Sequence, residues 1–483
     1  MCATITAMAV VAAPADEPAG EKPEVQTLRE QLTEREDETR VEKPLTVKVF
    51  GHPLTVLGQY EAVLEFFDRL ALGDVTNHYG QLLLEQEIEL EMFYSLGPQF
   101  SLFVQPRLIW EEDLDSETPD AVSDIYVERG EMWVDSRNIA GLPLSIEVGR
   151  LNFEDDRLWW WDEDLDAVRL IYENRADTFE VTLSAAQELF SARSGRSFVE
   201  AENEEVFRVI METSWDYSPN HALEFFGLYH YDHSRTEPPG TILKEDREDE
   251  SDAQLIWAGI RASGAWDMQK RGVLGYWLDV GGVVGRERLL ETTTNSAQKV
   301  MVDEVRSLDV RGWGFDAGVT YVFPVKADPR ISVGYAMGSG DRDPDDGVDH
   351  AYRQTGLHGN ETGFGGVQRF KAYGRILEPE LSNLSVFTAG IGCSLFQWSS
   401  LDLIFHDYRL IEPAESLRDT KLDAELTGKH HELGQGIDLV LAIEEWTRVE
   451  FEVSASAFRA GQAFGTDHGE WIFGTFAAVR VAF

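Results

Sequence analysis

From Leu45 to the C-terminus, segments of roughly 8–14 residues alternate apolar side chains with polar or small ones. In residues 312–323 (GWGFDAGVTYVF), one face is wholly apolar or aromatic, whereas the other holds glycine, aspartate and threonine. Residues 385–396 and 471–483 alternate in the same way. Successive side chains of a β-strand point to opposite faces, so this period of two predicts strands. No long run with the helical period follows residue 45, and we therefore expect an all-β chain.

The composition of the second face indicates the surroundings of these strands. In a large soluble β-sandwich or propeller, which is the alternative fold, that face would be charged and exposed to water. Here it is rich in Gly, Ser and Thr, and aromatic residues gather at the strand ends. This arrangement suits lipid outside, water inside and aromatic girdles at both interfaces. We therefore predict a transmembrane antiparallel β-barrel of the bacterial outer membrane, a class whose chains commonly end in phenylalanine, as this one does at Phe483.

The spacing of the segments predicts about eighteen strands, and a ring of that size leaves a lumen too wide for strand side chains alone to fill. Short links at 217–221 and 324–330 are expected to be periplasmic turns. The long links, expected to be extracellular loops, are 188–204, 232–252, 287–305, 336–365 and 411–433.

Composition and charge restrict the partners of the chain. A formal net charge of −45 argues against nucleic-acid binding, which needs a basic surface. Cys2 and Cys393 are far apart in the sequence, so we expect no structural disulfide, and we expect no metal or other cofactor. Residues 1–15 have the pattern of a signal-peptide remnant, with a disordered tail as the alternative. Residues 16–44 are predicted to be a charged linker and residues 45–483 a single barrel.

An anion pathway through such a barrel needs cations on the inward faces of the strands. Arginine suits this task because its planar fork can hold a carboxylate through two hydrogen bonds. Arg369, Lys371 and Arg375 share one face with Tyr373 and form a basic row along one predicted strand. The same alternation turns four further arginines inward: Arg107, Arg169, Arg448 and Arg480. Arg261 fits this inward phase more loosely. For each of them the alternative to conduction is a structural ion pair, but we expect a positive excess in the lumen as a whole.

Residues 149–170 (GRLNFEDDRLWWWDEDLDAVRL) combine three adjacent tryptophans with many charges. We expect strands at 142–151 and 165–173 joined by a connection at 152–164, whose rings anchor at the interface or plug against the barrel wall. Strict alternation puts Arg150 on the lipid side, so we expect a rim position or a bulge there, because a bare arginine in mid-bilayer costs about 2–4 kcal/mol. The acids expected to pair with Arg150, Arg157 and Arg169 are Asp155, Asp156, Asp162 and Asp164.

This segment, together with residues 351–384 (AYRQTGLHGNETGFGGVQRFKAYGRILEPELSNL), 399–409 (SSLDLIFHDYR) and 458–465 (FRAGQAFG), resembles the alginate-export outer-membrane porin family from about residue 55 onward. The resemblance implies an eighteen-stranded monomeric barrel. It also implies an arginine-lined constriction that passes an anionic uronate polysaccharide outward, with periplasmic export components as partners.

The same resemblance favours a lumen role for Arg129 and Arg150, and it implies that lumen acids form a gate, with Asp162 first and Asp166 next. The sequence departs from the family pattern in its acidity and at Arg375, where an acid is expected. These departures leave the solute open as an anionic or carbohydrate-type molecule.

Two other functions compete with export. A passive uptake porin for acidic oligosaccharides would share the fold, and an outer-membrane β-barrel enzyme could use paired carboxylates such as Asp155 and Asp156. The chain has no GxSxG or HExxH element and no glycine-rich phosphate loop. His406 is a lone lumen-facing histidine, which more often braces a wall than acts as a base. We therefore expect a transporter and not an enzyme.

Overall fold

The computed structural model describes residues 44–68, 72, 81–114, 123–174, 178–196, 198–200, 203–234, 236–243, 251–294, 300–367, 369–422 and 424–483. The expected signal remnant and almost all of the expected linker lie outside these residues. None of the short helical turns in the described part of the chain is long enough to reach across a bilayer.

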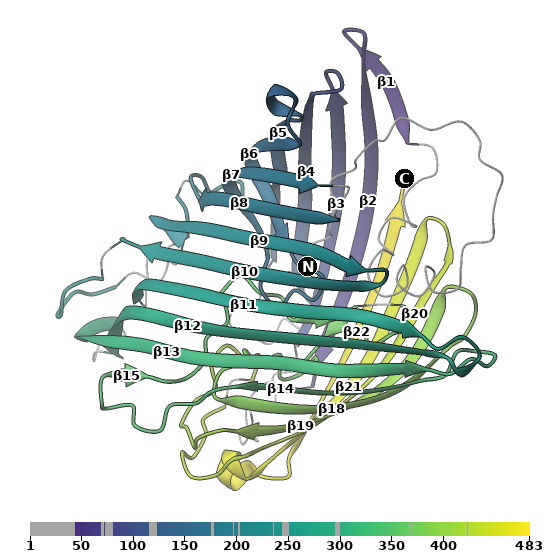
Figure 1. The fold of residues 1–483 in the computed structure, drawn as a ribbon. Coiled ribbons are helices and arrows are strands. Elements are labelled where there is room, and N and C mark those ends of the chain that lie inside the picture. The colour runs from purple at the N-terminus through teal and green to yellow at the C-terminus, as the bar shows by residue number, and fades with distance from the viewer. Residues whose placement is uncertain are drawn as a thin grey trace.

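Eighteen strands of the described chain form one closed antiparallel ring (Figure 1). Each strand pairs with the next in sequence, and β22 pairs with β2 from Gln59↔Ala482 to Phe67↔Gly474 to close the ring. The prediction of an eighteen-stranded β-barrel is confirmed. Its strands are β2 (His52–Phe67), β3 (Gln81–Ser95), β4 (Phe100–Asp113), β5 (Ser123–Ser136), β6 (Leu144–Glu154), β7 (Asp162–Asn174), β8 (Phe179–Gln187), β9 (Val206–Ser218), β10 (His221–Asp232), β11 (Ser251–Asp267), β12 (Val273–Thr294), β13 (Val300–Val322), β14 (Arg330–Gly338), β18 (Leu384–Ser394), β19 (Ser399–Leu410), β20 (Glu432–Trp446), β21 (Val449–Ala460) and β22 (Trp471–Ala482).

Four shorter strands lie outside the ring. β1 (Leu45–Val49) pairs with the start of β2, beyond the end of β22. β15 (Val348–Asp349) runs parallel to β13, and β16 (Glu361–Thr362) pairs with β17 (Phe370–Lys371) in a small hairpin. Both β15 and this hairpin belong to the long connection between β14 and β18. The helical turns are η2 (Ile139–Gly141), η5 (Gln269–Arg271) and η6 (Gln462–Asp467).

The two faces of the strands differ as the alternation predicts. In β13, Trp313 and Val319 are exposed on the outer face, whereas Asp316 and Thr320 are buried on the inner face. The outer faces of β18 and β22 likewise expose Phe387, Ile391, Trp471 and Phe473. A belt of apolar side chains around a polar interior is the arrangement that a barrel in lipid requires.

The connections at the two ends of the barrel differ in length. One end of the barrel, which we call the short-turn end, carries short turns such as 219–220 and 323–329. The first residues of β2 and the last residues of β22 lie at the same end. The other end carries the long connections, including residues 339–383 between β14 and β18 (the long-loop end). The expected loop at 287–305 is wrong, because β12 continues to Thr294 and β13 begins at Val300. The alternating, threonine-rich sequence there extends the hairpin instead of ending it.

The barrel wall divides between β5 and β6. These strands pair only from Ser136↔Ile146 to Met132↔Arg150, and β7 pairs with β8 only as far as Ala167↔Ala186. The rest of the β6–β7 hairpin therefore leaves the wall on both flanks. Residues 188–194 (the covering segment) lie along the freed edge of β5, where Arg129 N donates to Ala192 O and Ser194 N donates to Val127 O, each at 2.8 Å.

We predict that Val280→Arg destabilises the barrel. Val280 lies on the outer face of β12, opposite Ile260 of β11 and Phe315 of β13, and arginine among lipid chains costs up to about 2–4 kcal/mol. Urea unfolding in lipid vesicles measures this cost, and Val280→Leu is the matched control. Equal stability of the two variants would mean that this face does not meet lipid.

Candidate conduction pathway

The tip of the β6–β7 hairpin fills part of the lumen. Trp159, Trp160 and Trp161 are 2%, 0% and 1% exposed. Trp160 stacks on Phe226 and lies so close to the inner face of β11 that a Cβ atom at Gly259 would come within 2.2 Å of its ring. Glycine is required there because the ring packs directly on the strand backbone. Of the two places expected for the tryptophans, the structure has the plug against the barrel wall.

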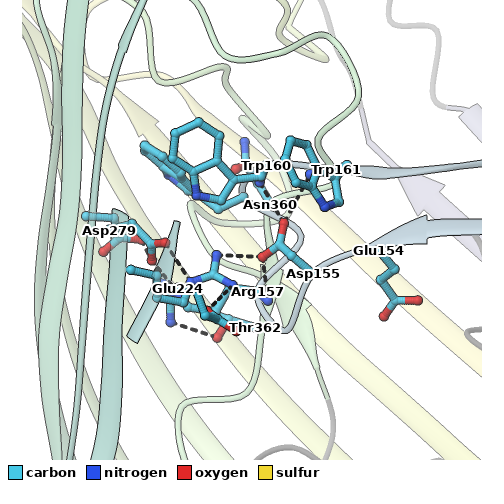
Figure 2. A network of polar contacts seen from close by, with 12 residues as sticks. Glu154, Asp155, Arg157, Trp160, Trp161, Glu224, Asp279, Asn360 and Thr362 are labelled. Atoms are coloured by element: carbon cyan, nitrogen blue, oxygen red, sulfur yellow. Dashed lines mark hydrogen bonds and ion pairs between the residues drawn. The ribbon is translucent and has the colours of Figure 1, made fainter. Parts of the chain in front are cut away.

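Asp155 is the centre of the charge network that holds this hairpin (Figure 2). Its carboxylate accepts hydrogen bonds from Trp160 N (2.7 Å) and Trp161 N (3.0 Å) and lies 2.5 Å from an Arg261 nitrogen of β11. Burial acts to raise the pKa of Asp155, but Arg261 and the backbone donors outweigh it and lower the pKa. Trp160 and Trp161 lie on one side of Asp155, and Glu154 points away from the network.

Arg157 extends this network to two further wall strands. It contacts Asp279 of β12 at 3.2 Å and Asp316 of β13 at 2.8 Å, and it donates to Thr362 Oγ1 at 3.0 Å. Asp279 also pairs with Arg261 at 2.6 Å, which closes the circuit of charges. The expected pairing is therefore wrong for Asp155, which pairs with Arg261 of β11, and for Asp164, which lies 3.3 Å from Arg107 of β4, because the hairpin bends into the lumen.

The connection of residues 339–383 is the second insert in the lumen. Tyr373 donates to Asp316 Oδ2 at 3.1 Å and accepts from Trp159 Nε1 at 3.0 Å, so the two inserts are joined. Tyr352 stacks on Trp159 and occupies the space left by Gly314 on the inner face of β13. Gln354 donates to Trp159 O at 3.3 Å.

The predicted basic strand at Arg369–Arg375 is wrong. Only Phe370–Lys371 is a strand, and Gly374 has a φ of 85°, which ends the extended conformation. The structure nevertheless keeps these side chains inside the barrel. Arg369 pairs with Glu154 at 2.8 Å, and Arg375 pairs with Glu452 of β21 at 3.1 Å.

Two cavities lie beside the inserts. The larger, about 330 Å³, lies between the β14–β18 connection and the β19–β20 connection. The smaller, about 180 Å³, lies between the inserts and the wall strands β2, β3 and β22. Lys371, Glu378 and Lys421 line both cavities, so these three side chains form the junction between them. Lys421 Nζ lies 3.1 Å from Glu65 and 3.0 Å from Glu378, which ties both connections to the wall.

The β16–β17 hairpin beside this junction holds two perturbed titratable groups. Burial acts to raise the pKa of Glu361, but the Lys371 ammonium at 3.0 Å outweighs it and lowers the pKa to about 2. Burial, and then Lys371, lowers the pKa of His358 to about 4. The surroundings therefore favour the ionised form of Glu361 and the uncharged form of His358.

Three of the predicted wall arginines lie on inner faces, each paired with acids. Arg107 contacts Glu89 (3.2 Å), Glu128 and Asp164 (both 3.3 Å), and it is 5% exposed. Arg169 pairs with Glu147 at 3.2 Å, and Arg480 pairs with Glu61 at 3.0 Å and Glu450 at 3.6 Å. Their conducting role stays a prediction.

Arg150 and Asp166 lie where the hairpin leaves the wall. Arg150 is 3.9 Å from Glu188, and Asp166 holds Arg129 through two contacts at 2.7 and 3.1 Å. Asp166 also accepts from Leu189 N at 3.0 Å. The covering segment shields these charges from lipid. Arg150 therefore avoids the bilayer through this cover, and not through the expected rim position or bulge.

The remaining predicted residues are dispersed. The expectation that Arg448 faces the lumen is wrong, because Arg448 is exposed in the turn between β20 and β21. His406 braces the wall, with Nδ1 3.0 Å from Thr388 Oγ1 and Nε2 3.5 Å from Asp438. Asp162 lies against Gly359 of the second insert, and its Oδ1 atom has no hydrogen-bond partner among the described residues.

From the sequence, Arg261 was predicted only weakly as an inward-facing residue, and Lys421 was not predicted at all. Arg261 fits the inward phase only loosely, yet it is 1% exposed and anchors the hairpin. Lys421 lies in a connection assigned to the outside of the barrel. The available signal was the glycine-rich inner face of β11–β13, against which the inserted rings pack.

Comparison with known proteins agrees with this architecture. The crystal structure of Pseudomonas aeruginosa OccK5 (OpdH) matches with a TM-score of 0.53 at 9% identity, over 89% of this chain and 98% of that chain. The outer membrane protein OprD from Pseudomonas aeruginosa matches with a TM-score of 0.52 at 9% identity, over 89% and 93%. At this identity the likeness concerns the fold alone. The apolar belt and the closed ring define the chain as an outer-membrane β-barrel protein.

The family model described as Alginate export matches residues 57–472, so the chain belongs to the alginate export family. A relative named Alginate production protein AlgE, from Azotobacter vinelandii, is 28% identical over 147 residues, which are 29% of this chain. The match spans 30% of that relative's length. The family resemblance found in the sequence is confirmed.

We predict that Trp160→Ala loosens the hairpin plug and raises single-channel conductance in planar bilayers. Truncating a fully buried tryptophan costs about 3–5 kcal/mol, here at the contact between the plug and the wall. Trp215→Ala is the matched control, because Trp215 is exposed on the outer face of β9. Equal conductance of the two variants would mean that the plug does not limit the passage.

We predict a pH dependence from the β16–β17 hairpin. Its stabilisation is complete at neutral pH, falls as His358 takes up a proton between about pH 6.5 and 4, and falls again as Glu361 is protonated between about 4.5 and 2. Conductance should rise in two phases as the pH falls. His358→Gln should remove the first phase and keep the second; a wild-type conductance that stays flat to pH 3 would contradict this account.

Proposed function

We propose that this protein exports alginate, or a closely similar uronate polysaccharide, across the outer membrane as a monomer that receives the polymer from periplasmic export components. Family membership over residues 57–472 is the observation that carries this proposal. The name of the Azotobacter relative, Alginate production protein AlgE, supports the same substrate.

The route that we propose runs along the inserts and not along the barrel axis. The hairpin plug occupies the side of the lumen next to β10–β13, since Trp160, Asp155 and Arg157 contact those strands. The smaller cavity lies beside β2, β3 and β22, and the larger cavity meets it at Lys371, Glu378 and Lys421. A linear polymer would thread this side in an extended form.

Lys371 and Lys421 are the cations that we propose to contact the polymer. Their side chains are 26% and 31% exposed, and both line the two cavities. Their present partners are carboxylates of Glu361, Glu65 and Glu378, so a uronate carboxylate offers each ammonium the same kind of ligand. Transient exchange of one carboxylate for another would let the polymer move without being trapped.

Export is tested in an alginate-producing bacterium that lacks its own outer-membrane exporter. Expression of this chain should restore uronic acid in the medium, whereas the empty vector should not. The amount of protein in the outer membrane is measured in parallel. Correctly inserted protein without released polymer would contradict the proposal.

We predict that Lys371→Gln/Lys421→Gln weakens the block of ion current by alginate oligosaccharides in planar bilayers by about tenfold or more. Each lost charge-assisted hydrogen bond is worth about 1.5–3 kcal/mol before solvent exposure reduces it. Lys326→Gln is the matched control, because Lys326 is exposed in the turn at the short-turn end. Equal block in both variants would remove the two lysines from the pathway.

Two rival functions make different predictions. An enzyme would generate new reducing ends from alginate, so purified protein in detergent is assayed for chain cleavage. A passive uptake porin would carry oligosaccharides into cells without any polymer synthesis. The family favours a transporter over an enzyme, and genes for polymer synthesis beside this one would favour export over uptake.

A further inference from the structure

The outer face of the barrel carries a group of arginines at the long-loop end. Arg286 and Arg288 lie on β12 and Arg311 lies on β13, and we call these three residues the arginine patch. The side chains of Arg286 and Arg311 are 84% and 61% exposed, and Arg288 is also exposed. Glu287, between the two β12 arginines, is buried and binds Arg353 inside the barrel. Because side chains alternate along a strand, both β12 arginines point away from the lumen.

The three arginines are close neighbours on this face. Arg311 pairs with Val284, so it is the diagonal neighbour of Arg286, and their Cβ atoms are about 7–8 Å apart. Arg288 follows Arg286 on the same face, about 6–7 Å further along the strand. The planar fork of arginine binds phosphate oxygens through two parallel hydrogen bonds. The patch therefore offers several such forks to one phosphorylated headgroup.

The position of the patch along β12 places it at the edge of the hydrocarbon. Tyr276 of β12 belongs to an aromatic group at the short-turn end, where it stacks on Trp266 at 4.4 Å between centroids and its hydroxyl lies 3.1 Å from that of Tyr217. Arg286 follows Tyr276 by about ten residues, and a transmembrane β-strand has about 9–11 residues. The exposed side chains between them on this face are apolar: Leu278, Val280 and Val284. One bilayer span therefore ends where the patch begins.

The loops indicate which leaflet the patch meets. In outer-membrane barrels the short turns face the periplasm and the long loops face the outside. The patch lies at the long-loop end, so the headgroups beside it are those of the outer leaflet. In the outer membrane this leaflet consists largely of lipopolysaccharide, whose lipid A part carries phosphate groups on a disaccharide.

Two acids are in register with the patch on the neighbouring strands. Asp309 of β13 contacts Arg286 at 3.2 Å and Arg311 at 3.5 Å. Asp252 of β11 is the ladder partner of Arg288, and it accepts hydrogen bonds from Ser234 and Thr236 at 3.3 and 3.0 Å. Three guanidinium groups thus face two carboxylates, which leaves a local positive excess in a chain with a net charge of −45. The high exposure of Arg286 leaves it accessible beside Asp309.

We propose that the arginine patch binds the phosphate groups of lipopolysaccharide in the outer leaflet. The charge of the patch, its distance of one bilayer span from Tyr276 and its continuity with the apolar belt support this ligand. β12 and β13 continue beyond the patch, to Thr294 and from Val300, so the bound lipid would hold the base of this long hairpin at the membrane surface (Figure 1). The inference goes beyond the proposed export function and does not depend on the exported polymer.

The experiment titrates the purified protein in detergent micelles with lipid A, and native mass spectrometry measures the bound lipid. The wild-type protein should bind phosphorylated lipid A and should bind lipid A stripped of its phosphates at least about tenfold more weakly. In Arg286→Gln/Arg288→Gln the affinity for phosphorylated lipid A should fall by about tenfold or more, because one charge-assisted hydrogen bond contributes at least about this factor. Equal binding of the two lipids by the wild-type protein would overturn the proposal without any variant.

Lys270→Gln/Arg271→Gln is the matched control, because it removes the same charge from exposed residues in the turn at the short-turn end. A shift in electrophoretic mobility on heating verifies that each variant is folded. Equal affinity of the two double variants for lipid A would remove the arginine patch from the binding site.

Competition identifies the source of the bound anion. Inorganic phosphate and alginate oligosaccharides, each added at the concentration of the lipid, should leave lipid A bound. Displacement by inorganic phosphate would show a site for free phosphate, and displacement by the oligosaccharides would show a site for the polymer. Either displacement would overturn the assignment to lipopolysaccharide.

Discussion

The structure depends on the pairing of every backbone donor and acceptor that hydrocarbon surrounds. An unpaired peptide group in lipid costs several kcal/mol, so the ring must close, and β22 meets β2 for this reason. The same requirement acts where β6 leaves β5. The covering segment supplies Ala192 O and Ser194 N to the freed edge of β5, and this substitution permits the hairpin to bend inward. The plug and the shielding of Arg150 and Asp166 both follow from it.

Inside the ring, buried charges position the inserts. Asp155 joins Arg261 of the wall to the backbone of the hairpin, and Arg157 joins the hairpin to Asp279 and Asp316. Loss of one member of such a network leaves an unpaired buried charge, at a cost of about 3–5 kcal/mol. Ion pairs of this kind set the location of the inserts more than they add stability, because desolvation offsets much of their attraction.

The barrel wall could be predicted from the sequence, but the path of the segments inserted in the lumen could not. Alternation identified the wall because lipid imposes it on each strand separately, as in β13 and β22. It failed at Lys371 and Arg375, where a short alternating stretch belongs to an insert whose path is set by long-range contacts with Asp316 and Glu452. It also failed at Arg448, since phase along a strand does not locate the turn. The glycines at 259 and 314 held the missing information, but an empty inner face fits water as well as a ring.

Because of the tryptophan plug, the circumference of the barrel does not determine the width of its pore. A ring of eighteen strands encloses enough space for a wide pore, yet much of that space holds two stored segments of the same chain. In such a protein the number of strands sets the total space that the barrel encloses. The width of the remaining bore is set by the residues that line it. Substitutions in the β6–β7 hairpin and the β14–β18 connection can thus change the width or the charge of the bore while the lipid-facing strands stay the same.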